Sequence, residues 1–334
     1  MEFLYFLESI RNPVCDFLFS LITLMGSETF FLAIAIFIFW CVDKRCGYYV
    51  LVTGLFGTVV NQFVKITAKI PRPWHIDESF TVVGNAAEDA GGYSFPSGHT
   101  QNVVGTLGSI ASYYPKRRVV IPLVCLMVLV AFSRMYLGVH TPYDVLFSAV
   151  FATLLVILLR PLFTNEGRFD KAMPIILAVC ALLSLAFLIY VFVMPEGGVD
   201  AENLDNAREN ACTLFACMLG FLGVYFVERK FVRFETSARW YSQIFKLAIG
   251  LIVVIAIKSL LKTPLIALAG GNEYIGRVIR YLLMVVFAGL LWPLSFKFWS
   301  SLRISSLDRL TDAVKGKLLK KRHAPAEAEE NVNE

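Results

Sequence analysis

Two histidines, a carboxylate and several cations lie in three short polar stretches of this 334-residue chain, each beside a long apolar run. The last stretch, residues 133–144, reads SRMYLGVHTPYD, and Asp144 follows His140 by four residues. That spacing lets the carboxylate reach one ring nitrogen of the histidine, which leaves the other nitrogen as an acceptor and nucleophile. Gly138 and Pro142 mark a turn between two helices. Asp144 can also cap the helix that follows this turn, and the two roles are compatible.

The second stretch, PSGH at residues 96–99, immediately precedes another apolar run. Ser97 is a good N-cap residue, and Gly98 lets the backbone come close to a ligand. The free N–H groups and the dipole of a helix start attract anions, so this stretch is suited to phosphate. The alternative is a simple Ser/Gly cap with His99 at the membrane interface.

The remaining stretch, residues 65–73, reads KITAKIPRP and follows an apolar run. Lys65 and Arg72 are seven residues, or two helical turns, apart, so both side chains can point toward one place. An ionisable residue near a membrane span is costly and indicates a function. The alternative for Lys65 is a lysine that snorkels to the membrane interface.

The composition indicates a membrane protein and excludes a large soluble enzyme, because 57% of the residues are hydrophobic, only 17% are charged and the mean hydropathy is +0.64. We predict an all-α, polytopic membrane helix bundle with about nine transmembrane helices. These spans are expected at residues 30–41, 48–67, 100–114, 119–135, 142–162, 173–194, 211–227, 243–261 and 278–299. We interpret residues 12–25 as an interfacial helix, with half of a tight hairpin as the alternative. The seven scattered cysteines are interpreted as apolar packing residues.

This order of spans brings the three polar stretches to the same membrane face. The connections on the opposite face hold many basic residues, whereas residues 195–210 are acidic. The positive-inside rule therefore places the C-terminus in the cytoplasm and the polar stretches on the non-cytoplasmic side. Two histidines would converge there with the cations Lys65, Arg72 and Arg134. This combination indicates a phosphoryl-transfer site, where the protein must mainly position the substrate and neutralise the charge of its phosphate.

The three stretches also carry a family resemblance. KxxxxxxRP at residues 65–73, PSGH at 96–99 and SRxxxxxHxxxD at 133–144 resemble, in order and without departure, the signature of the type 2 phosphatidic acid phosphatase superfamily. That family includes lipid phosphate phosphatases, undecaprenyl-diphosphate phosphatases, sphingosine-phosphate phosphatases, glucose-6-phosphatase and the vanadium haloperoxidases. A haloperoxidase is disfavoured because that branch is soluble.

Position by position, the resemblance implies that His140 attacks phosphorus and that Asp144 orients the ring of His140. It implies that His99 protonates the leaving oxygen and then activates water. The phosphate oxygens would be held by Lys65, Arg72, Ser97, Gly98 and Arg134. The resemblance implies no metal ion and no other cofactor.

Four regions are predicted from these patterns. An N-terminal interfacial segment (residues 1–26) precedes the phosphatase core (27–163), an accessory transmembrane region (164–300) and a basic amphipathic and disordered cytoplasmic tail (301–334). For the tail, a solvated charged segment is the alternative. The loop between the first two motifs is expected to be either a simple solvated loop or a selectivity lid. The candidate lid residues are Trp74, His75, Asp77, Glu78, Glu88 and Asp89.

The predicted function is that of an integral cell-membrane phosphatase that hydrolyses a lipid phosphate or diphosphate without a metal. Its expected partners are this substrate and membrane lipid, with no nucleic acid and no obligatory protein partner. A sugar-phosphate phosphatase similar to glucose-6-phosphatase is the alternative, because nine spans and a non-cytoplasmic site resemble that enzyme. A transporter or lipid-binding protein with a relic site is the non-enzymatic alternative. It is disfavoured because a relic would be expected to lose His140, His99 or Arg134.

Overall fold

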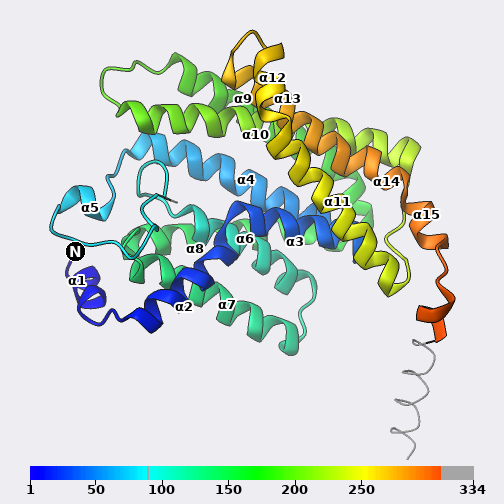
Figure 1. Cartoon of the computed structure of the whole chain (residues 1–334), viewed down its shortest axis with the longest axis horizontal. Coiled ribbons are helices and arrows are strands. Elements are labelled where there is room, and N and C mark those ends of the chain that lie inside the picture. Colours follow the sequence, from blue (N-terminus) through cyan, green and yellow to red (C-terminus); the bar gives the residue numbers. More distant parts are fainter. Residues whose placement is uncertain (89, 310–334) are drawn as a thin grey trace, which may run out of the picture.

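The computed structural model describes residues 1–88 and 90–309 as a bundle of helices (Figure 1). Within these residues the only β-structure is an isolated bridge between Gly197 and Val199. The helices are α1 (Glu2–Ser9), α2 (Pro13–Thr23), α3 (Glu28–Cys41), α4 (Lys44–Ala68), α5 (Pro73–Ile76), α6 (Gly98–Tyr113), α7 (Arg117–Tyr136), α8 (Pro142–Thr164), α9 (Glu166–Val193), α10 (Ala201–Val227), α11 (Trp240–Leu260), α12 (Lys262–Leu268), α13 (Glu273–Val286), α14 (Trp292–Leu294) and α15 (Phe296–Ser301). The segments Glu228–Val232 and Phe287–Leu291 continue α10 and α13 as wider π-helical turns.

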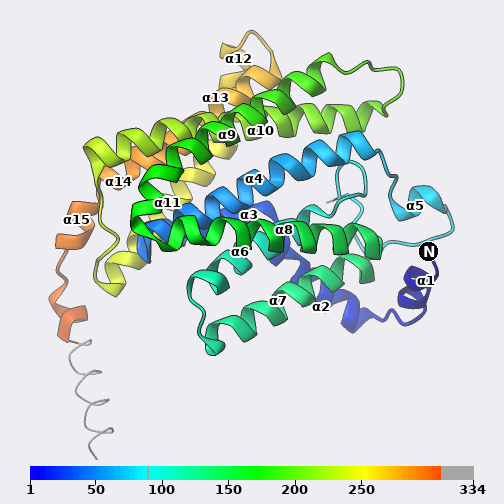
Figure 2. The same ribbon diagram turned by 180° about the vertical axis from the view of Figure 1, so that it is seen from behind.

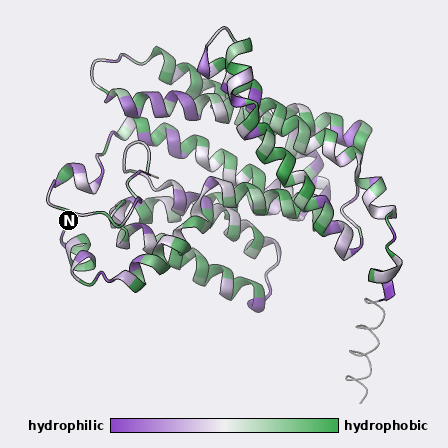
Figure 3. Cartoon of the chain, viewed as in Figure 1, coloured by the Kyte–Doolittle hydropathy of each residue, from purple (hydrophilic) through white to green (hydrophobic). Residues whose placement is uncertain are grey.

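The predicted all-α polytopic bundle is confirmed. Seven helical segments within the described residues are long and apolar enough to cross a membrane, or eight if α2 and α3, which are bent by 51°, form one span. Hydrophobic residues cover most of the length of α7 and α11 (Figure 3). The nine predicted spans are these seven together with α3 and α6, which have only 14 and 16 residues. A helix rises about 1.5 Å per residue, so α6 alone is shorter than the hydrocarbon core of a bilayer.

Helix α6 lies at the centre of the predicted phosphatase core, where it contacts α3, α4, α7 and α8. Its sequence is unusually polar for a membrane protein, and Gln101, Asn102, Thr106 and Ser109 are all buried. Polar side chains are tolerated within a membrane protein where they face other helices rather than lipid. Helix α6 can therefore begin at the polar site and remain short, because neighbouring helices surround it.

The accessory helices pack directly on this core. Helices α9 and α10 contact α4, and α11 contacts α3, so α4 lies between the core helices and the α9–α10 pair (Figures 1 and 2). The buried carboxylate of Glu228 accepts a hydrogen bond of 2.7 Å from Lys44 at the start of α4. The buried ammonium of Lys246 in α11 donates to the carbonyl of Trp40 at 2.8 Å. These contacts make the two halves one bundle.

The connections divide between the two ends of the bundle, as the span order predicts. The loop of residues 77–97 and the N-terminus lie at one end, and α15 lies at the other (Figure 1). A cavity at the α15 end is lined by Lys44 and Arg45 together with Glu166, Arg229 and Arg233. Three of the connections rich in basic residues therefore meet at the end opposite the three motifs.

The N-terminal segment lies against the core and forms two helices. Phe19 of α2 packs its ring on Phe132 and Tyr136 of α7, with ring centroids 5.4 and 4.5 Å apart. The interfacial placement of residues 1–26 stays a prediction. All seven cysteines are free. The predicted basic tail from residue 310 onward lies outside the described residues.

Candidate active site

The turn that carries His140 follows directly from the end of α7. Gly138 has a φ of 84°, and the N–H groups of Val139 and His140 both donate to the carbonyl of Arg134, at 3.1 and 3.3 Å. A β-carbon at Gly138 would lie 2.7 Å from a side-chain nitrogen of Arg11, so both the backbone conformation and the space favour glycine. The predicted turn is therefore present, and it brings His140 beside Arg134.

Asp144 holds the His140 ring, as predicted. Its Oδ2 lies 3.4 Å from His140 Nδ1 and also accepts hydrogen bonds from Thr141 N at 2.7 Å and Ser94 Oγ at 2.6 Å. Thr141 and Asp144 form a reciprocal capping box at the start of α8. Both contacts expected of Asp144, with the His140 ring and at the start of α8, are thus found together, with Ser94 as an additional donor.

The other ring nitrogen of His140 meets Arg72. Arg72 Nη1 lies 3.1 Å from His140 Nε2. A guanidinium has only donors, so Nε2 is the acceptor and carries a lone pair. The proton of the neutral ring then lies on Nδ1, where it is donated to Asp144. This arrangement is the tautomer that a nucleophilic Nε2 requires.

Burial and positive charge keep the His140 ring neutral. The side chain is almost fully buried, which lowers the pKa of His140 well below its usual value because burial disfavours the charged imidazolium. The charges of Arg72, Arg134 and Lys65 lower this pKa further. At neutral pH the ring is therefore unprotonated at Nε2.

Arg72 and Lys65 are both bonded to the loop that precedes α6. Arg72 donates to the carbonyls of Gly91 and Gly92 at 2.9 and 3.0 Å and to Val139 at 2.9 Å. Lys65 Nζ donates to two more carbonyls of this loop, those of Tyr93 and Pro96, at 2.6 and 3.1 Å. The two cations from the first motif therefore hold the backbone around the second motif while both line the same cavity.

Helix α6 begins as the second motif predicts. Ser97 is the N-cap, its Oγ accepts from the N–H and hydroxyl of Thr100 at 3.5 and 3.0 Å, and its own N–H donates to the carbonyl of Asp144 at 3.2 Å. Gly98 and His99 are the first two residues of the helix, where N–H groups have no partner within the helix. A β-carbon at Gly98 would meet nothing within 4 Å, so this backbone faces open space. Ser97 supports the helix start, and Gly98 and His99 line the cavity.

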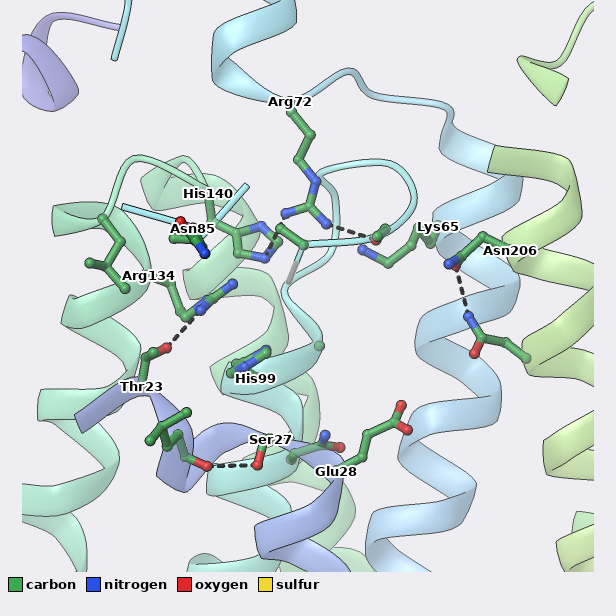
Figure 4. Close-up of a pocket in the computed structure, with 18 of the residues that line it drawn as sticks. Thr23, Ser27, Glu28, Lys65, Arg72, Asn85, His99, Arg134, His140 and Asn206 are labelled. Atoms are coloured by element: carbon green, nitrogen blue, oxygen red, sulfur yellow. Dashed lines mark hydrogen bonds between the residues drawn. The ribbon is translucent and has the colours of Figure 1, made fainter. Parts of the chain in front are cut away.

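A cavity of about 480 Å³ brings the predicted residues together. In Figure 4, Arg72, Lys65 and Arg134 point from three sides toward the space beside His140 and His99. The ring of His99 makes no hydrogen bond to another protein group within the part of the chain that is described. Six of the eight predicted residues line this space, whereas Ser97 and Asp144 lie behind it.

Several cavity residues were missed by sequence reasoning. Thr23 of α2 accepts a 2.6 Å hydrogen bond from Arg134 Nη1. Asn206 and Asn210 of α10 line the cavity from the accessory region and are bonded to each other at 2.9 Å. No motif marks these residues, because their place in the site follows only from the packing of α2 and α10. Ser94, which bonds to Asp144, was also missed. Its position three residues before Ser97 of the second motif was the only sign in the sequence that it lies near the site.

The loop between the first two motifs is attached to α1. Asp77 bonds to Tyr5 and Ser79, and the N–H of Thr81 donates to Glu8 at 2.9 Å. The centroid of the Trp74 ring lies 5.8 Å from the Arg72 guanidinium. Trp74, His75 and Glu88 line an outer cavity of about 530 Å³, which shares Arg72 with the active-site cavity. Glu78 is exposed, and Asp89 lies outside the described residues. The lid role of this loop stays a prediction.

The bond between Ser94 and Asp144 gives a first testable prediction. Ser94→Ala should lower kcat about tenfold and leave KM within about twofold, because the carboxylate keeps two of its three donors but orients the His140 ring less firmly. The measurement is steady-state phosphate release. Ser148→Ala is the matched control, since its buried hydroxyl donates to the Asp144 carbonyl and not to the carboxylate. Equal losses in both variants would contradict a role for Ser94 in orienting His140.

Two profiles of known families match the chain. The PAP2 superfamily matches residues 46–168, and the PAP2 superfamily phosphatase transmembrane extension matches residues 212–302. The first profile contains all eight predicted site residues. The second covers residues 212–300 of the predicted accessory region and ends two residues beyond it.

Relatives of known name support the same family. Undecaprenyl-diphosphatase BcrC of Bacillus subtilis is 33% identical over 149 residues, which are 44% of this chain and 74% of that protein. Human sphingosine-1-phosphate phosphatase 2 is 26% identical over 193 residues, which are 56% of this chain and 47% of that protein. The lipid phosphate phosphatase delta of Arabidopsis thaliana is 26% identical over 161 residues, 45% of this chain and 39% of that protein. The chain thus spans about half the length or less of the last two relatives, and no solved structure matches it significantly. With the motifs, the site and these matches in agreement, the chain belongs to the PAP2 superfamily.

Proposed function

We propose that this protein is an integral membrane phosphatase that hydrolyses a lipid phosphate or diphosphate through a phosphohistidine at His140. The observation that carries the proposal is the position of the His140 ring, with Nε2 3.1 Å from the Arg72 guanidinium and Nδ1 3.4 Å from Asp144, in a cavity lined by Arg72, Arg134 and Lys65. The named relatives act on undecaprenyl diphosphate, sphingosine 1-phosphate or a lipid phosphate, which supports a lipid substrate.

In the first step, Nε2 attacks phosphorus, the N–P bond forms and the P–O bond to the leaving group breaks, an ester bond in a monophosphate and an anhydride bond in a diphosphate. Arg72, Arg134 and Lys65, with the N–H groups at the start of α6, stabilise the charge on the transferring phosphoryl oxygens. His99 donates its proton to the leaving oxygen. A bound phosphate dianion favours the protonated imidazole that this step needs.

In the second step, His99 takes a proton from water, and that water attacks phosphorus of the phosphohistidine. The N–P bond breaks, inorganic phosphate leaves and Nε2 regains its lone pair. Asp144 stabilises the positive charge that His140 carries while it is phosphorylated. One histidine therefore provides the nucleophile and the other transfers both protons.

Phosphate release from purified protein in detergent micelles tests the proposal. Lipid phosphates and isoprenyl diphosphates should be hydrolysed faster than sugar phosphates. A preference for sugar phosphates would favour the glucose-6-phosphatase-like alternative. Release from no member of the panel would favour a transporter or a lipid-binding protein.

We expect this activity to persist in excess EDTA, because three side-chain cations occupy the positions at which Mg²⁺ serves in other phosphoryl-transfer enzymes. Vanadate should inhibit by occupying the same oxygen-binding groups. The measurement is the rate of phosphate release before and after chelation. Full loss in EDTA with recovery on addition of Mg²⁺ would contradict the metal-free mechanism.

We further propose that the site faces away from the cytoplasm and that the C-terminus lies in it, because the basic connections gather at the α15 end. An impermeant thiol reagent on intact cells should label Glu88→Cys, beside the site, and spare Gly167→Cys at the other end. Both positions are exposed, and the wild-type chain gives the background from its own cysteines. Labelling of Gly167→Cys alone would invert this topology.

A further inference from the structure

A second cavity, of about 110 Å³, lies between the core helices α3 and α4 and the accessory helices α10, α11 and α13. Its lining is almost entirely apolar and includes Leu32, Ile36, Leu51, Leu55, Phe221 and Val224. Nothing in the chemistry proposed above uses this space. Its position relative to the active-site cavity suggests what could occupy it.

Helix α3 runs from one cavity to the other along a single face. Glu28, in its first turn, lines the active-site cavity, and Leu32 and Ile36 line the second cavity. The three residues are four apart, so their side chains lie one above another on the helix. At about 1.5 Å per residue, this face extends about 12 Å from the polar site into the bundle.

Two more helices show the same change from polar to apolar. On α4, Gln62 lines the active-site cavity, and Leu55, seven residues earlier on the same face, lines the second cavity. On α10, Asn210 lines the first cavity, and Cys217, seven residues later, lines the second. Helices α3, α4 and α10 therefore each present polar residues to the phosphate site and apolar residues deeper in the bundle.

Glu28 of the active-site cavity lies one helical turn before Leu32 of the second cavity, so the two cavities follow each other along α3. We call the path along α3, α4 and α10, from Glu28 to the apolar lining around Ile36, the chain groove. Its outer wall is formed by α11 and α13, through residues such as Val254 and Met284.

We propose that the chain groove holds a single hydrocarbon chain of the substrate, while the phosphate occupies the active-site cavity. This inference rests on the proposed lipid phosphatase function. A lipid phosphate joins a charged group to a long apolar chain, and the path along these three helices runs from a cationic cavity to an apolar one in the same order. The apolar part, of about 110 Å³, is smaller than the cavity of about 150 Å³ that holds one benzene ring. It therefore admits a few methylenes of one chain, as in an alkyl, sphingoid or isoprenoid phosphate, and excludes two acyl chains side by side. The accessory region would thereby contribute to substrate selection.

The test uses purified full-length protein in micelles and alkyl monophosphates from butyl to hexadecyl. In the wild type, kcat/KM should rise with chain length. Cys217→Phe and Val254→Phe place a larger ring in the groove from two different helices. Each should lower the ratio of kcat/KM for hexadecyl phosphate to that for butyl phosphate at least about tenfold, which corresponds to the loss of about two buried methylenes. Because the ratio is measured within each variant, a smaller amount of folded protein does not change it.

Cys125→Phe is the matched control, because this exposed cysteine on α7 lies outside the groove and its replacement should keep the wild-type ratio. An unchanged ratio in both groove variants, or an equal fall in Cys125→Phe, would overturn the chain groove alone. A wild-type preference for phosphatidic acid over hexadecyl phosphate would overturn the single-chain assignment. Absence of phosphate release from every substrate would instead overturn the proposed function, and the groove with it.

Discussion

Replacing His140 by alanine is expected to abolish turnover, with a loss of about 10⁵-fold or more, and to abolish any covalent phosphoenzyme. Among the described residues, His140 is the only histidine of the cavity whose ring contacts a carboxylate through one nitrogen and a guanidinium through the other. The ring of His99 also lines the cavity but has no such carboxylate partner among the described residues. The measurement is acid-labile, base-stable label after mixing with an activated aryl phosphate.

His99→Ala should behave differently, because His99 transfers protons rather than attacking. An alkoxide leaving group needs the proton, so the first step should fail with an alkyl phosphate. A phenolate of low pKa needs little help to leave, so the first step should partly recover with an aryl phosphate. The second step still lacks its base, and a phosphohistidine should accumulate. Label on His140→Ala, with none on His99→Ala, would reverse the two roles.

Arg134→Ala is expected to lower kcat/KM by about 10²–10³-fold, the loss typical of removing one preorganised donor to a developing negative charge. The buried guanidinium of Arg134 lines the cavity and is held by Thr23. It can contact two phosphate oxygens at once. The measurement is steady-state hydrolysis of one lipid phosphate over a range of concentrations.

Lys69→Ala is the matched control for charge. Lys69 ends α4, four residues after Lys65, but its side chain is exposed and donates to the carbonyl of Gly198 at 3.0 Å, away from the active-site cavity. Its replacement should change kcat/KM by less than about twofold, as for an exposed charge without a specific partner in the reaction. Equal losses in the two variants would mean that the phosphate-binding residues have been misplaced.

Much of the fold and the site was predictable because membrane insertion and capping leave strong local signals. Long apolar runs predict spans, and Gly138, Pro142 and Ser97 mark the ends at which His140 and His99 lie. The turn, the N-cap and the capping box at Asp144 were each found where the sequence placed them. Family membership followed from the order of three motifs that no single helix contains.

The rest could not be predicted because it depends on packing between distant segments. Asn206 reaches the active-site cavity only because α10 lies against α4, and Thr23 reaches Arg134 only because α2 lies along α7. The loop carbonyls that hold Arg72 and Lys65 carry no sequence signal, since every residue has a carbonyl. Helix α6 was predicted at residues 100–114, close to its observed bounds, but it was counted as a full span, because nothing in its sequence shows that neighbouring helices surround it.

In the proposed mechanism, the contact between Arg72 Nη1 and His140 Nε2 would keep His140 unreactive until a phosphate binds. While Nε2 accepts that proton, its lone pair is covered, and only a group that draws the Nη1 donor to itself can expose it. A phosphate dianion brings oxygens that compete strongly for this donor. The carboxylic esters of surrounding phospholipids are neutral and do not. If His140 is the nucleophile, its Nε2 could therefore stay unprotonated at rest without attacking the esters of the surrounding bilayer.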